Sequence, residues 1–568
     1  MSARKKRWVL KEAAPAPFLR TSREFSPVVA TLLYQRGMRD PQQIAAFLSS
    51  DYRSGIHDPF AMKGVDVAAS RIAKAIAQAE PVVVYGDFDA DGVTAVALLV
   101  QALGAMGAAI TPYIPHRQHE GYGLNHVAME KLAESGVKLL ITVDCGISNV
   151  AEVAHAQALG IDVIVTDHHT PPDVLPAAFA VVNPKQPGDG YPFSQLTGVG
   201  IAYKLVQALA RLGVRMPLRG RDLLDVVALG TVADLGPLLD ENRVLVKAGL
   251  ESLNTTQRPG LRALIEVAGL AMGRVTATDI SFMLGPRLNA AGRLDDAVLA
   301  YRLLLAADLA EARTLAEELN MANRRRQEMT REVQEAASEQ IRTRGMAQDR
   351  VIVLDGAYPA GIVGLVAARL VEEFGRPVLL VERGDDHSRG SARSVPGFSI
   401  IDALRSCDDV FVRYGGHSAA AGFTLPTARL GELSQRLNDY ADEHLPDDML
   451  QPALEIDAEV PLAALSWDLL SQLGKLEPFG VGNPQPVLMS SRVRAVSTAR
   501  PGRASAHLKL RLDDGAGGPS FDAIAFRLGH LAEYFSSPRY IDVAYTFEAN
   551  EWQGQRTLQL NVKDFRRA

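Results

Sequence analysis

The stretch Gly86-Asp87-Phe88-Asp89-Ala90-Asp91-Gly92 follows directly on the apolar run Val82–Tyr85. A short run rich in β-branched residues that ends at a glycine predicts a buried strand followed by a tight turn. Three acids within five residues repel one another unless a cation or strong donors hold them, and hard divalent ions prefer such oxygen ligands. For this motif alone, a solvated acidic turn that caps the next helix remains an alternative.

Outward from this motif, short apolar runs alternate with Ala- and Leu-rich helical patterns. The predicted strands are Val82–Tyr85, Leu139–Val143, Val163–Thr166 and Ala180–Val182, and the helical segments between them are Val93–Met106, Val127–Ser135 and Val150–Leu159. This alternation predicts a doubly wound parallel sheet. Ligands of such sheets bind at the carboxyl ends of the strands, where the acidic motif lies.

Three more motifs carry acids or histidines. They are Thr142-Val143-Asp144-Cys145-Gly146, Thr166-Asp167-His168-His169 and Gly230-Thr231-Val232-Ala233-Asp234-Leu235-Gly236-Pro237. A single strand-end aspartate such as Asp144 is often only a helix cap. Two adjacent histidines point to different sides, so one can bind a metal while the other faces a substrate. An unpaired carboxylate in the apolar segment around Asp234 would be costly to bury, which favours a cation partner.

Together, these four motifs are expected to converge on one crevice at the edge of the sheet. A bridging carboxylate with flanking carboxylate and imidazole ligands can hold two metal ions about 3.5–4 Å apart, as in phosphoryl-transfer enzymes. The sequence has no Walker A motif, GxGxxG fingerprint or serine-nucleophile elbow that would compete with this interpretation. It therefore predicts a two-metal phosphoesterase.

The rest of the chain divides by composition and periodicity. Residues 1–55 contain prolines among short helical patterns, and we expect them to pack as an extension on the first large domain, 56–305. Residues 306–345, rich in Ala, Glu, Leu and Arg, predict one long connecting helix. Residues 346–448 repeat an α/β pattern on a smaller scale. In residues 449–568 apolar and polar residues alternate with period two, which predicts an antiparallel barrel of the OB type.

The overall composition is that of an ordinary globular protein. Of the 568 residues, 47% are hydrophobic and 22% are charged, and the formal net charge is −6. Any nucleic-acid binding must therefore come from local basic surfaces. Two cysteines, Cys145 and Cys407, exclude a disulfide framework and suit a reducing cytosol. No signal peptide or apolar run long enough to span a bilayer is present, so we expect a cytoplasmic protein with no membrane contact.

The four motifs resemble the DHH phosphoesterase superfamily, and most closely its bacterial 5′→3′ exonucleases specific for single strands. The resemblance covers roughly residues 50–425 and includes Ile114–Arg117, Gly121–Leu124, Gly285–Arg293, Gly390–Ser394 and Tyr414–His417. It implies a multi-domain α/β fold. A parallel-sheet DHH domain would be joined by the long helix to a smaller α/β DHHA1 domain, and an OB-type barrel would follow.

The resemblance implies two divalent cations, Mn²⁺ or Mg²⁺, as cofactors. The implied metal ligands are Asp87, Asp89, Asp91, Asp144, His168 and Asp234. Asp89 would hold one ion and Asp91 the other, with Asp144 bridging them. The second site would be completed by His168 and Asp234.

Further roles implied by the resemblance concern Asp87 and the substrate. Asp87 would either bind an ion directly or support a ligand, and His169 would face the scissile phosphate. Ser391 and Arg393 would recognise the terminal 5′-phosphate with help from Arg117, since guanidinium forks and hydroxyls suit a phosphate. A surface location is the alternative for each arginine.

The other candidate substrate contacts carry stronger alternatives. The turn Gly415-Gly416-His417 would bring backbone and imidazole to a phosphate near the metals, or would be a simple hairpin. Tyr122 is a candidate stacking platform for bases, with core packing as the alternative. Arg287 and Arg293 would contact the strand together with Asn289, or would form interdomain salt bridges.

Two basic segments are candidates for the path of the strand. One is Asn323–Arg326 on the long helix, where three charges are usually just a solvated face. The other is the interval Pro478–Leu512, which lacks acids and contains Arg492, Arg494, Arg500, Arg503, Lys509 and Arg511. An acid-free basic stretch in an OB-type barrel predicts a groove for single strands.

The sequence thus predicts a metal-dependent 5′→3′ exonuclease that releases 5′-mononucleotides from single-stranded DNA in recombination and repair. The resemblance implies a single-strand-binding protein and a helicase as partners, and the linked domains can work as a monomer. One alternative is a shorter DHH enzyme type acting on oligoribonucleotides, cyclic dinucleotides or pyrophosphate. The other is a DNA-binding scaffold without activity, which the full set of acids and histidines disfavours.

Overall fold

The computed structural model describes residues 6–49, 51–117, 119–294, 296–501 and 505–568. The chain forms two compact units. The larger unit comprises residues 50–450 with 480–482, and the smaller comprises 1–49, 451–479 and 483–568. No helix in the described ranges is long and apolar enough to cross a membrane.

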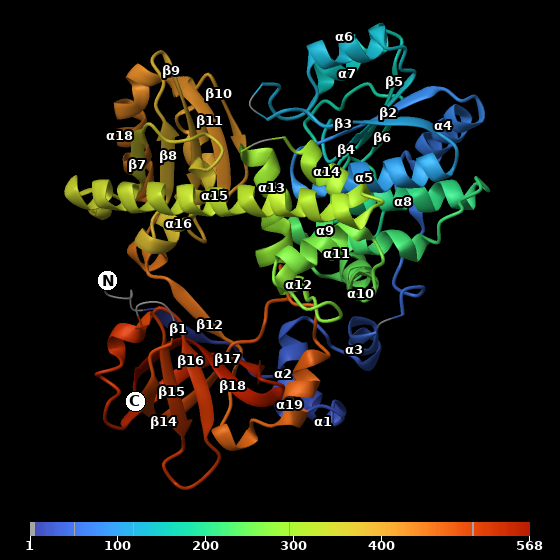
Figure 1. Ribbon diagram of the computed structural model, residues 1–568. Helices are drawn as coiled ribbons and strands as arrows, with labels where there is room; N and C mark the ends of the chain where they lie inside the picture. Colours follow the sequence, from blue (N-terminus) through green and yellow to red (C-terminus); the bar gives the residue numbers. More distant parts are fainter. Residues whose placement is uncertain (1–5, 50, 118, 295, 502–504) are drawn as a thin grey trace. The chain divides into compact units, whose positions relative to one another are not determined.

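A parallel five-stranded sheet forms the centre of the first domain of the larger unit (Figure 1). Its order is β3-β2-β4-β5-β6, with β2 (Pro81–Gly86), β3 (Ala109–Tyr113), β4 (Leu139–Val143), β5 (Asp162–Thr166) and β6 (Ala180–Val182). The predicted strands and their parallel arrangement are confirmed. The sequence pattern did not indicate β3, because this edge strand is mostly exposed and carries Pro112 instead of an apolar run.

Helices cover both faces of this sheet because successive strand residues point to opposite sides. On one face Val82, Val84 and Ile141 pack against helices that include α4 (Val65–Ala77), α5 (Ala90–Ala105) and α8 (Gly198–Arg211). On the other face Val83 and Val163 pack against α6 (His126–Glu134) and α7 (Val150–Ala158). Burial on both faces explains why these strands are continuous apolar runs.

A helical layer continues the domain after the sheet. Its members are α9 (Leu224–Ala233), α10 (Asp240–Asn254), α11 (Pro259–Val267), α12 (Ala277–Asp279), the π-helical turn Ile280–Leu284, α13 (Gly285–Leu294) and α14 (Val298–Leu305). The predicted long helix is α15 (Leu309–Thr343), capped by the Asp308 carboxylate, which accepts a hydrogen bond from the Glu311 N–H. Its first half packs on the helical layer through Leu315 and Leu319, and Ile341 near its end packs on the second α/β domain.

The second α/β domain contains a mixed sheet of order β10-β11-β9-β8-β7. Its strands are β7 (Ile352–Gly356), β8 (Val378–Glu382), β9 (His387–Arg393), β10 (Arg413–Gly416) and β11 (Ala420–Pro426), and its helices are α16 (Val363–Phe374), α17 (Ile400–Arg405) and α18 (Leu430–His444). Only β7 and β8 run parallel, and the other neighbours are antiparallel. The start of α16 packs next to Ser391 and Arg393 of β9, so the helix and this strand line one pocket together.

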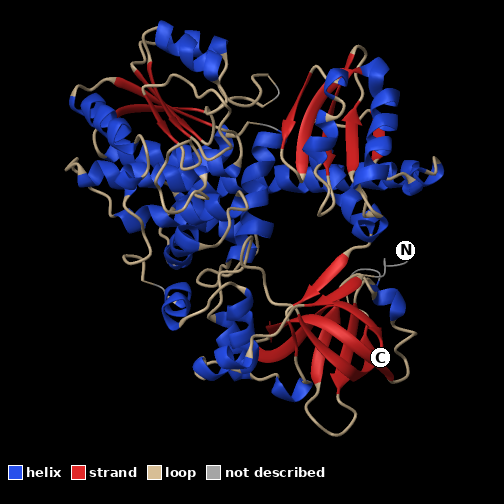
Figure 2. Cartoon of the chain, turned by 180° about the vertical axis from the view of Figure 1, so that it is seen from behind, coloured by secondary structure: helices blue, strands red, loops and turns tan. Residues whose placement is uncertain are grey.

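The smaller unit contains a closed barrel (Figure 2). Its strands are β13 (Ala458–Glu459), β14 (Leu488–Ala499), β15 (Leu508–Asp513), β16 (Phe521–Ala525), β17 (Arg539–Trp552) and β18 (Gln555–Arg567), with helix α19 (Trp467–Gly474) beside them. The sheet closes because β14 pairs with both β15 and β17. Leu508, Leu510 and Leu512 all point into the core, which confirms the period-two prediction.

The N-terminal segment packs against the barrel, so the expectation that it covers the first large domain is wrong. Strand β1 (Arg7–Leu10) pairs in parallel with β12 (Ala453–Ile456). Helices α1 (Ala16–Thr21), α2 (Pro27–Gln35) and α3 (Pro41–Leu48) add buried apolar side chains to the barrel's own core. The physical reason is complementarity: the fully buried Leu32 and Leu33 join that core, and the Lys11 ammonium lies 2.9 Å from the Asp457 carboxylate.

Candidate metal centre and arginine pocket

The first acidic motif forms the turn between β2 and α5. Asp89 caps α5 through Oδ1, which accepts hydrogen bonds from the N–H groups of Asp91 and Gly92 at 2.9 and 3.1 Å. The helix-cap alternative is thus part of the structure. Asp91 is fully buried, and its two oxygens accept from the N–H groups at the start of α8, Gly198 at 2.6 Å and Val199 at 2.9 Å. The helix N-termini hold both carboxylates in place.

Asp144 lies just after β4 at the centre of the site. Its backbone adopts the left-handed conformation with φ 59°, which is uncommon for a non-glycine residue. The side chain is 2% exposed, and its Oδ1 lies 2.9 Å from His168 Nε2. Gly198 allows Asp144 to pack against the start of α8, because a Cβ there would lie 2.7 Å from the Asp144 Cβ. Strained backbone conformations persist where the surrounding structure holds them in place, and they are often found at functional sites.

The two histidines after β5 point differently, as the sequence predicts. His168 Nε2 also lies 3.9 Å from Asp91 Oδ2 and 3.7 Å from Asp234 Oδ2. His169 is more exposed and its Nδ1 lies 2.8 Å from Asp167 Oδ1. Asp167 itself is oriented by three backbone N–H groups at 2.7–3.0 Å. The sequence motif did not assign this positioning role to Asp167.

The four motifs meet in one cluster. Three groups have donor atoms that all lie within 4.8 Å of one another: Asp87, Asp89 and Asp144; Asp91, His168 and Asp234; and Asp144, His168 and His169. Asp144 belongs to two of these groups and so does His168. The arrangement offers two adjacent oxygen-rich groups, and the third group links them through Asp144 and His168.

Electrostatics favour a cation in this cluster. Burial, followed by repulsion from neighbouring carboxylates, raises the pKa of Asp91 to about 7 and also raises the pKa values of Asp87, Asp144 and Asp234. Burial lowers the pKa of His168 to about 3, which keeps its imidazole neutral with a free lone pair.

Buried atoms without hydrogen-bond partners also favour a bound cation. Asp87 Oδ1, Asp144 Oδ1 and His168 Nε2 are buried without a hydrogen-bond partner of good geometry among the described residues, and each is a potential metal donor. The 2.9 Å approach of the last two atoms brings their lone pairs to one point and makes no hydrogen bond. The residues present therefore fit divalent cations such as Mn²⁺ or Mg²⁺.

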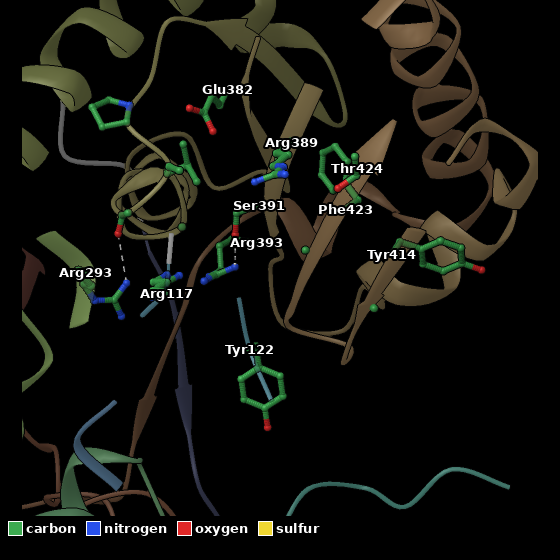
Figure 3. Close-up of a pocket in the computed structure, with 18 of the residues that line it drawn as sticks. Arg117, Tyr122, Arg293, Glu382, Arg389, Ser391, Arg393, Tyr414, Phe423 and Thr424 are labelled. Atoms are coloured by element: carbon green, nitrogen blue, oxygen red, sulfur yellow. Dashed lines mark hydrogen bonds between the residues drawn. The ribbon is translucent and has the colours of Figure 1, made fainter. Parts of the chain in front are cut away.

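A large pocket in the same unit collects many of the predicted substrate contacts (Figure 3). It has a volume of about 930 Å³. Of the predicted residues, it is lined by Arg117, Tyr122, Arg293, Ser391, Arg393 and Gly415. The Arg393 Nη1 donates to Ser391 Oγ at 2.7 Å, so these two side chains form one donor surface. Tyr122 lies between the two sites, since its hydroxyl is 3.3 Å from His169 Nδ1.

Other predicted contacts lie outside this pocket. The Asn289 Oδ1 accepts from the Ala90 N–H at 2.8 Å and so supports the metal-binding turn. Arg287 donates to Asn320 Oδ1 on α15 and to the Met283 carbonyl. His417 is exposed, as is Gly416, and among the described residues no hydrogen bond or ion pair joins the His417 side chain to the acidic cluster.

Several basic side chains of the barrel interval Pro478–Leu512 are paired with carboxylates, which the sequence of that interval did not indicate. Arg494 forms a bidentate pair with Asp513, and Lys509 and Arg511 both pair with Asp522 at 2.8–2.9 Å. These acids lie beyond the acid-free interval but come opposite it in the sheet. Arg503 lies outside the described residues.

Sequence reasoning missed two arginines of the pocket, Arg389 and Arg413. Arg325, which also lines the pocket, belongs to the basic segment Asn323–Arg326 that was a candidate for the path of the strand. Arg389 precedes Ser391 and Arg393 with a spacing of two residues. On a strand this spacing places all three side chains on one face, so it could have identified Arg389. Arg413 comes from β10, and nothing in its local sequence links it to Ser391.

Comparison with known proteins agrees with this architecture. Residues 81–231 match the DHH family N-terminal domain, residues 348–443 the DHHA1 domain and residues 456–564 the RecJ OB domain. The single-stranded-DNA-specific exonuclease RecJ of Bacillus subtilis is 38% identical, covering 99% of this chain and 71% of that protein. RecJ of Escherichia coli is 35% identical, covering 95% of this chain and 96% of that protein.

Solved structures show the same relationship. RecJ from Thermus thermophilus in complex with Mn²⁺ superposes with a TM-score of 0.82 at 33% identity, covering 99% of this chain and 80% of that one. Its complex with Mg²⁺ gives a TM-score of 0.78. These likenesses extend over the parallel sheet, the long helix, the second α/β domain and the barrel. This chain therefore belongs to the RecJ family of DHH-domain proteins.

Proposed function

We propose that this protein is a metal-dependent exonuclease that degrades single-stranded DNA from its 5′ end and releases 5′-mononucleotides in recombination and repair. One observation carries the proposal: a cluster of carboxylates and histidines that fits two cations lies beside a pocket of guanidinium groups. The first can hydrolyse a phosphodiester, and the second can hold a terminal phosphate. Family membership supports the same activity.

Two Mn²⁺ or Mg²⁺ ions would be held by Asp87, Asp89, Asp91, Asp144, His168 and Asp234, with Asp144 shared. When bound, such ions activate water and stabilise the leaving oxygen. The protein supplies fixed carboxylates: the start of α5 holds Asp89 and the start of α8 holds Asp91. Neutral His168 contributes a lone pair instead of a charge.

His169 is proposed to face the scissile phosphate. Burial lowers its pKa, but the hydrogen bond to Asp167 and the nearby carboxylates outweigh this and raise the pKa overall. A protonated imidazole at this place donates to a phosphate oxygen and stabilises charge in the transition state. Asp167 fixes the ring through Nδ1, which leaves Nε2 for the substrate.

We propose that the arginine pocket sets the 5′→3′ direction of digestion. Ser391, Arg393 and Arg117 would bind the 5′-phosphate, and Tyr122 would stack on a base near the cleavage site. A strand anchored by its 5′ end presents its first internucleotide phosphate to the metals. In this proposal Arg293 supports the path, and so do Arg287, Asn289 and the Gly415-Gly416-His417 turn.

The domains divide the task in this proposal. Residues 56–305 carry the chemistry, 346–448 recognise the 5′ end, and 306–345 connect them. Residues 449–568 bind the strand farther along, with 1–55 as an extension of the chain. We infer that the protein acts as a monomer in the cytoplasm, where single-strand-binding protein and a helicase would expose its substrate.

A cleavage assay tests the proposal. A 5′-phosphorylated, 3′-labelled single-stranded oligonucleotide is incubated with the protein and Mn²⁺ and followed in time. We expect stepwise loss from the 5′ side, release of 5′-mononucleotides and resistance of a blunt duplex of the same sequence. Activity confined to di- and trinucleotides, or rapid digestion of the blunt duplex, would contradict the proposal.

A further inference from the structure

The arginine pocket carries far more positive charge than one terminal phosphate requires. Its arginines are Arg117, Arg293, Arg325, Arg389, Arg393 and Arg413. Among the described residues that line it, Glu382 is the one acid. A terminal phosphate monoester carries about −1.5 to −2 near neutral pH. A ligand with additional phosphoryl groups would match this surface better.

The arginines of β9 form a row along one face of the second sheet. Arg389, Ser391 and Arg393 occupy alternate positions, so their side chains share a face, while Ser388 and Ala392 are fully buried on the other. Two residues of a strand span about 6.8 Å. Arg389 therefore lies one strand repeat beyond the Ser391–Arg393 donor surface, farther along the pocket (Figure 3).

Neighbouring strands flank this outer position on both sides, and on the β8 side the residue paired with Arg389 is Glu382. Thr424 of β11 pairs with Arg389, and Arg413 of β10 pairs with Thr424, so two guanidinium groups flank one hydroxyl. Both arginines are exposed, and neither guanidinium has a hydrogen bond or ion pair with any described residue. Other exposed arginines of this domain are paired, such as Arg383 with Asp355.

The floor beside Ser391, next to the outer row, is bare. Gly422 pairs with both Ser391 and Gly415, which places the two glycines side by side next to the Arg389–Thr424–Arg413 row. A Cβ added at either glycine would meet nothing within 4 Å, so packing does not require glycine there. The absence of side chains leaves a continuous path from Ser391 to the outer row.

We propose that Arg389, Arg413 and Thr424 form an outer anion subsite for the β- and γ-phosphates of a strand whose 5′ end carries a triphosphate. The inference rests on the proposed function, which puts the first 5′-phosphate at Ser391 and Arg393. A linear chain of two further phosphoryl groups spans the distance to the outer row. Such ends are left where nucleic-acid synthesis starts without a primer.

The inference specifies an unusual first product. Hydrolysis breaks the bond between the 3′ oxygen of the first nucleotide and the next phosphorus. The oxygen of water joins that phosphorus, and a proton goes to the 3′ oxygen. The first nucleotide therefore leaves as a nucleoside 5′-triphosphate, and the shortened strand keeps an ordinary 5′-monophosphate.

Three oligonucleotides of one sequence, with 5′-hydroxyl, 5′-monophosphate and 5′-triphosphate ends, provide the test. With the full-length protein and Mn²⁺, we expect the KM of the triphosphate end to be about tenfold or more below that of the monophosphate end. Mass spectrometry of the earliest products should show the nucleoside triphosphate. Equal KM values for these two ends would overturn the inference.

Variants separate the outer subsite from the inner one. Arg389→Gln, Arg413→Gln and the double variant should each lower the preference for the triphosphate end over the monophosphate end, the double variant by about tenfold or more. Arg383→Gln is the matched control, because its guanidinium is paired in the same domain. Equal losses for all three ends in the Arg389→Gln and Arg413→Gln variants would show ordinary backbone contacts instead and would overturn the inference.

Binding measurements keep the inference distinct from the proposed function. Fluorescence anisotropy of the same labelled strands, with chelator present, should show tighter binding of the triphosphate end even if no cleavage occurs. Free tripolyphosphate should compete for this end, and less effectively in the double variant. If tripolyphosphate binds but the triphosphate end gains no affinity, the subsite serves free polyphosphate and the inference about strand ends is wrong.

Discussion

In the metal cluster, buried carboxylates lie within reach of one another and are fixed by backbone N–H groups, whereas in the arginine pocket guanidinium groups line an open cavity. The cluster draws its ligands from the carboxyl ends of three strands of one sheet and, for Asp234, from the end of helix α9. The pocket draws its side chains from both α/β domains and the long helix between them. The cluster is thus preorganised for chemistry on a phosphodiester, while we propose that the pocket selects which end of a strand is presented.

The largest effect is expected at Asp144, the carboxylate that we propose to bridge the two ions. Asp144→Asn keeps the shape of the side chain, and asparagine tolerates the left-handed backbone at this position, but the bridging charge is lost. We expect kcat to fall by about a thousandfold or more. Single-turnover cleavage of a 5′-phosphorylated strand measures this effect, and anisotropy should show that the strand still binds. The exposed Glu134→Gln serves as control, and near-parental cleavage by Asp144→Asn would refute the bridging role.

A smaller and more selective effect is expected in the pocket. Arg393→Gln removes a charge-assisted contact to the 5′-phosphate, which corresponds to a loss of about ten- to a hundredfold in kcat/KM. The loss should affect the 5′-phosphorylated strand and largely spare the 5′-hydroxyl strand, so the ratio of the two is the measurement. Arg383→Gln should leave that ratio unchanged. A uniform loss for both strands would mean that Arg393 contacts the strand elsewhere.

Asn289 tests where the cluster ends and substrate binding begins. Its amide oxygen accepts from the Ala90 N–H at the start of α5, so Asn289→Ala should loosen the metal-binding turn. We expect a decrease of about tenfold in apparent Mn²⁺ affinity, as for other groups that orient metal ligands. A Mn²⁺ titration of activity at saturating DNA measures it. An increase in the KM for DNA with unchanged Mn²⁺ dependence would instead assign Asn289 to the substrate.

The smallest effects are expected on the barrel. The Arg494 guanidinium is held by Asp513, so Arg494→Gln should change strand affinity less than about twofold and the unfolding free energy by less than about 1 kcal/mol. The exposed Arg492 has no such side-chain pair with a described residue. If Arg492 contacts a phosphate of the strand, Arg492→Gln should reduce the slope of log binding constant against log salt concentration by about 0.7. Anisotropy titrations at several salt concentrations measure both. A larger effect at Arg494 than at Arg492 would reverse this assignment.

Much of the metal cluster could be predicted because its ligands follow strands that are buried on both faces. Such strands are continuous β-branched runs, and an acid directly after one of them has a known place at the edge of the sheet. Asp89, Asp144 and His168 were identified in this way, and the structure places them together. The left-handed backbone of Asp144 and the positioning contact of Asp167 had no such signal.

The sequence by itself determined the local elements: the parallel strands, the long helix, the alternating strands of the barrel and the motifs at strand ends. Their patterns have periods of two or 3.6 residues, which short stretches are enough to specify. Only the tertiary structure decided that residues 6–49 pack on the barrel, that Arg494 and Arg511 are paired, and that Arg389 and Arg413 share a pocket with Arg117. Each of these depends on side chains brought together by strand pairing or domain packing, and no local period records such contacts.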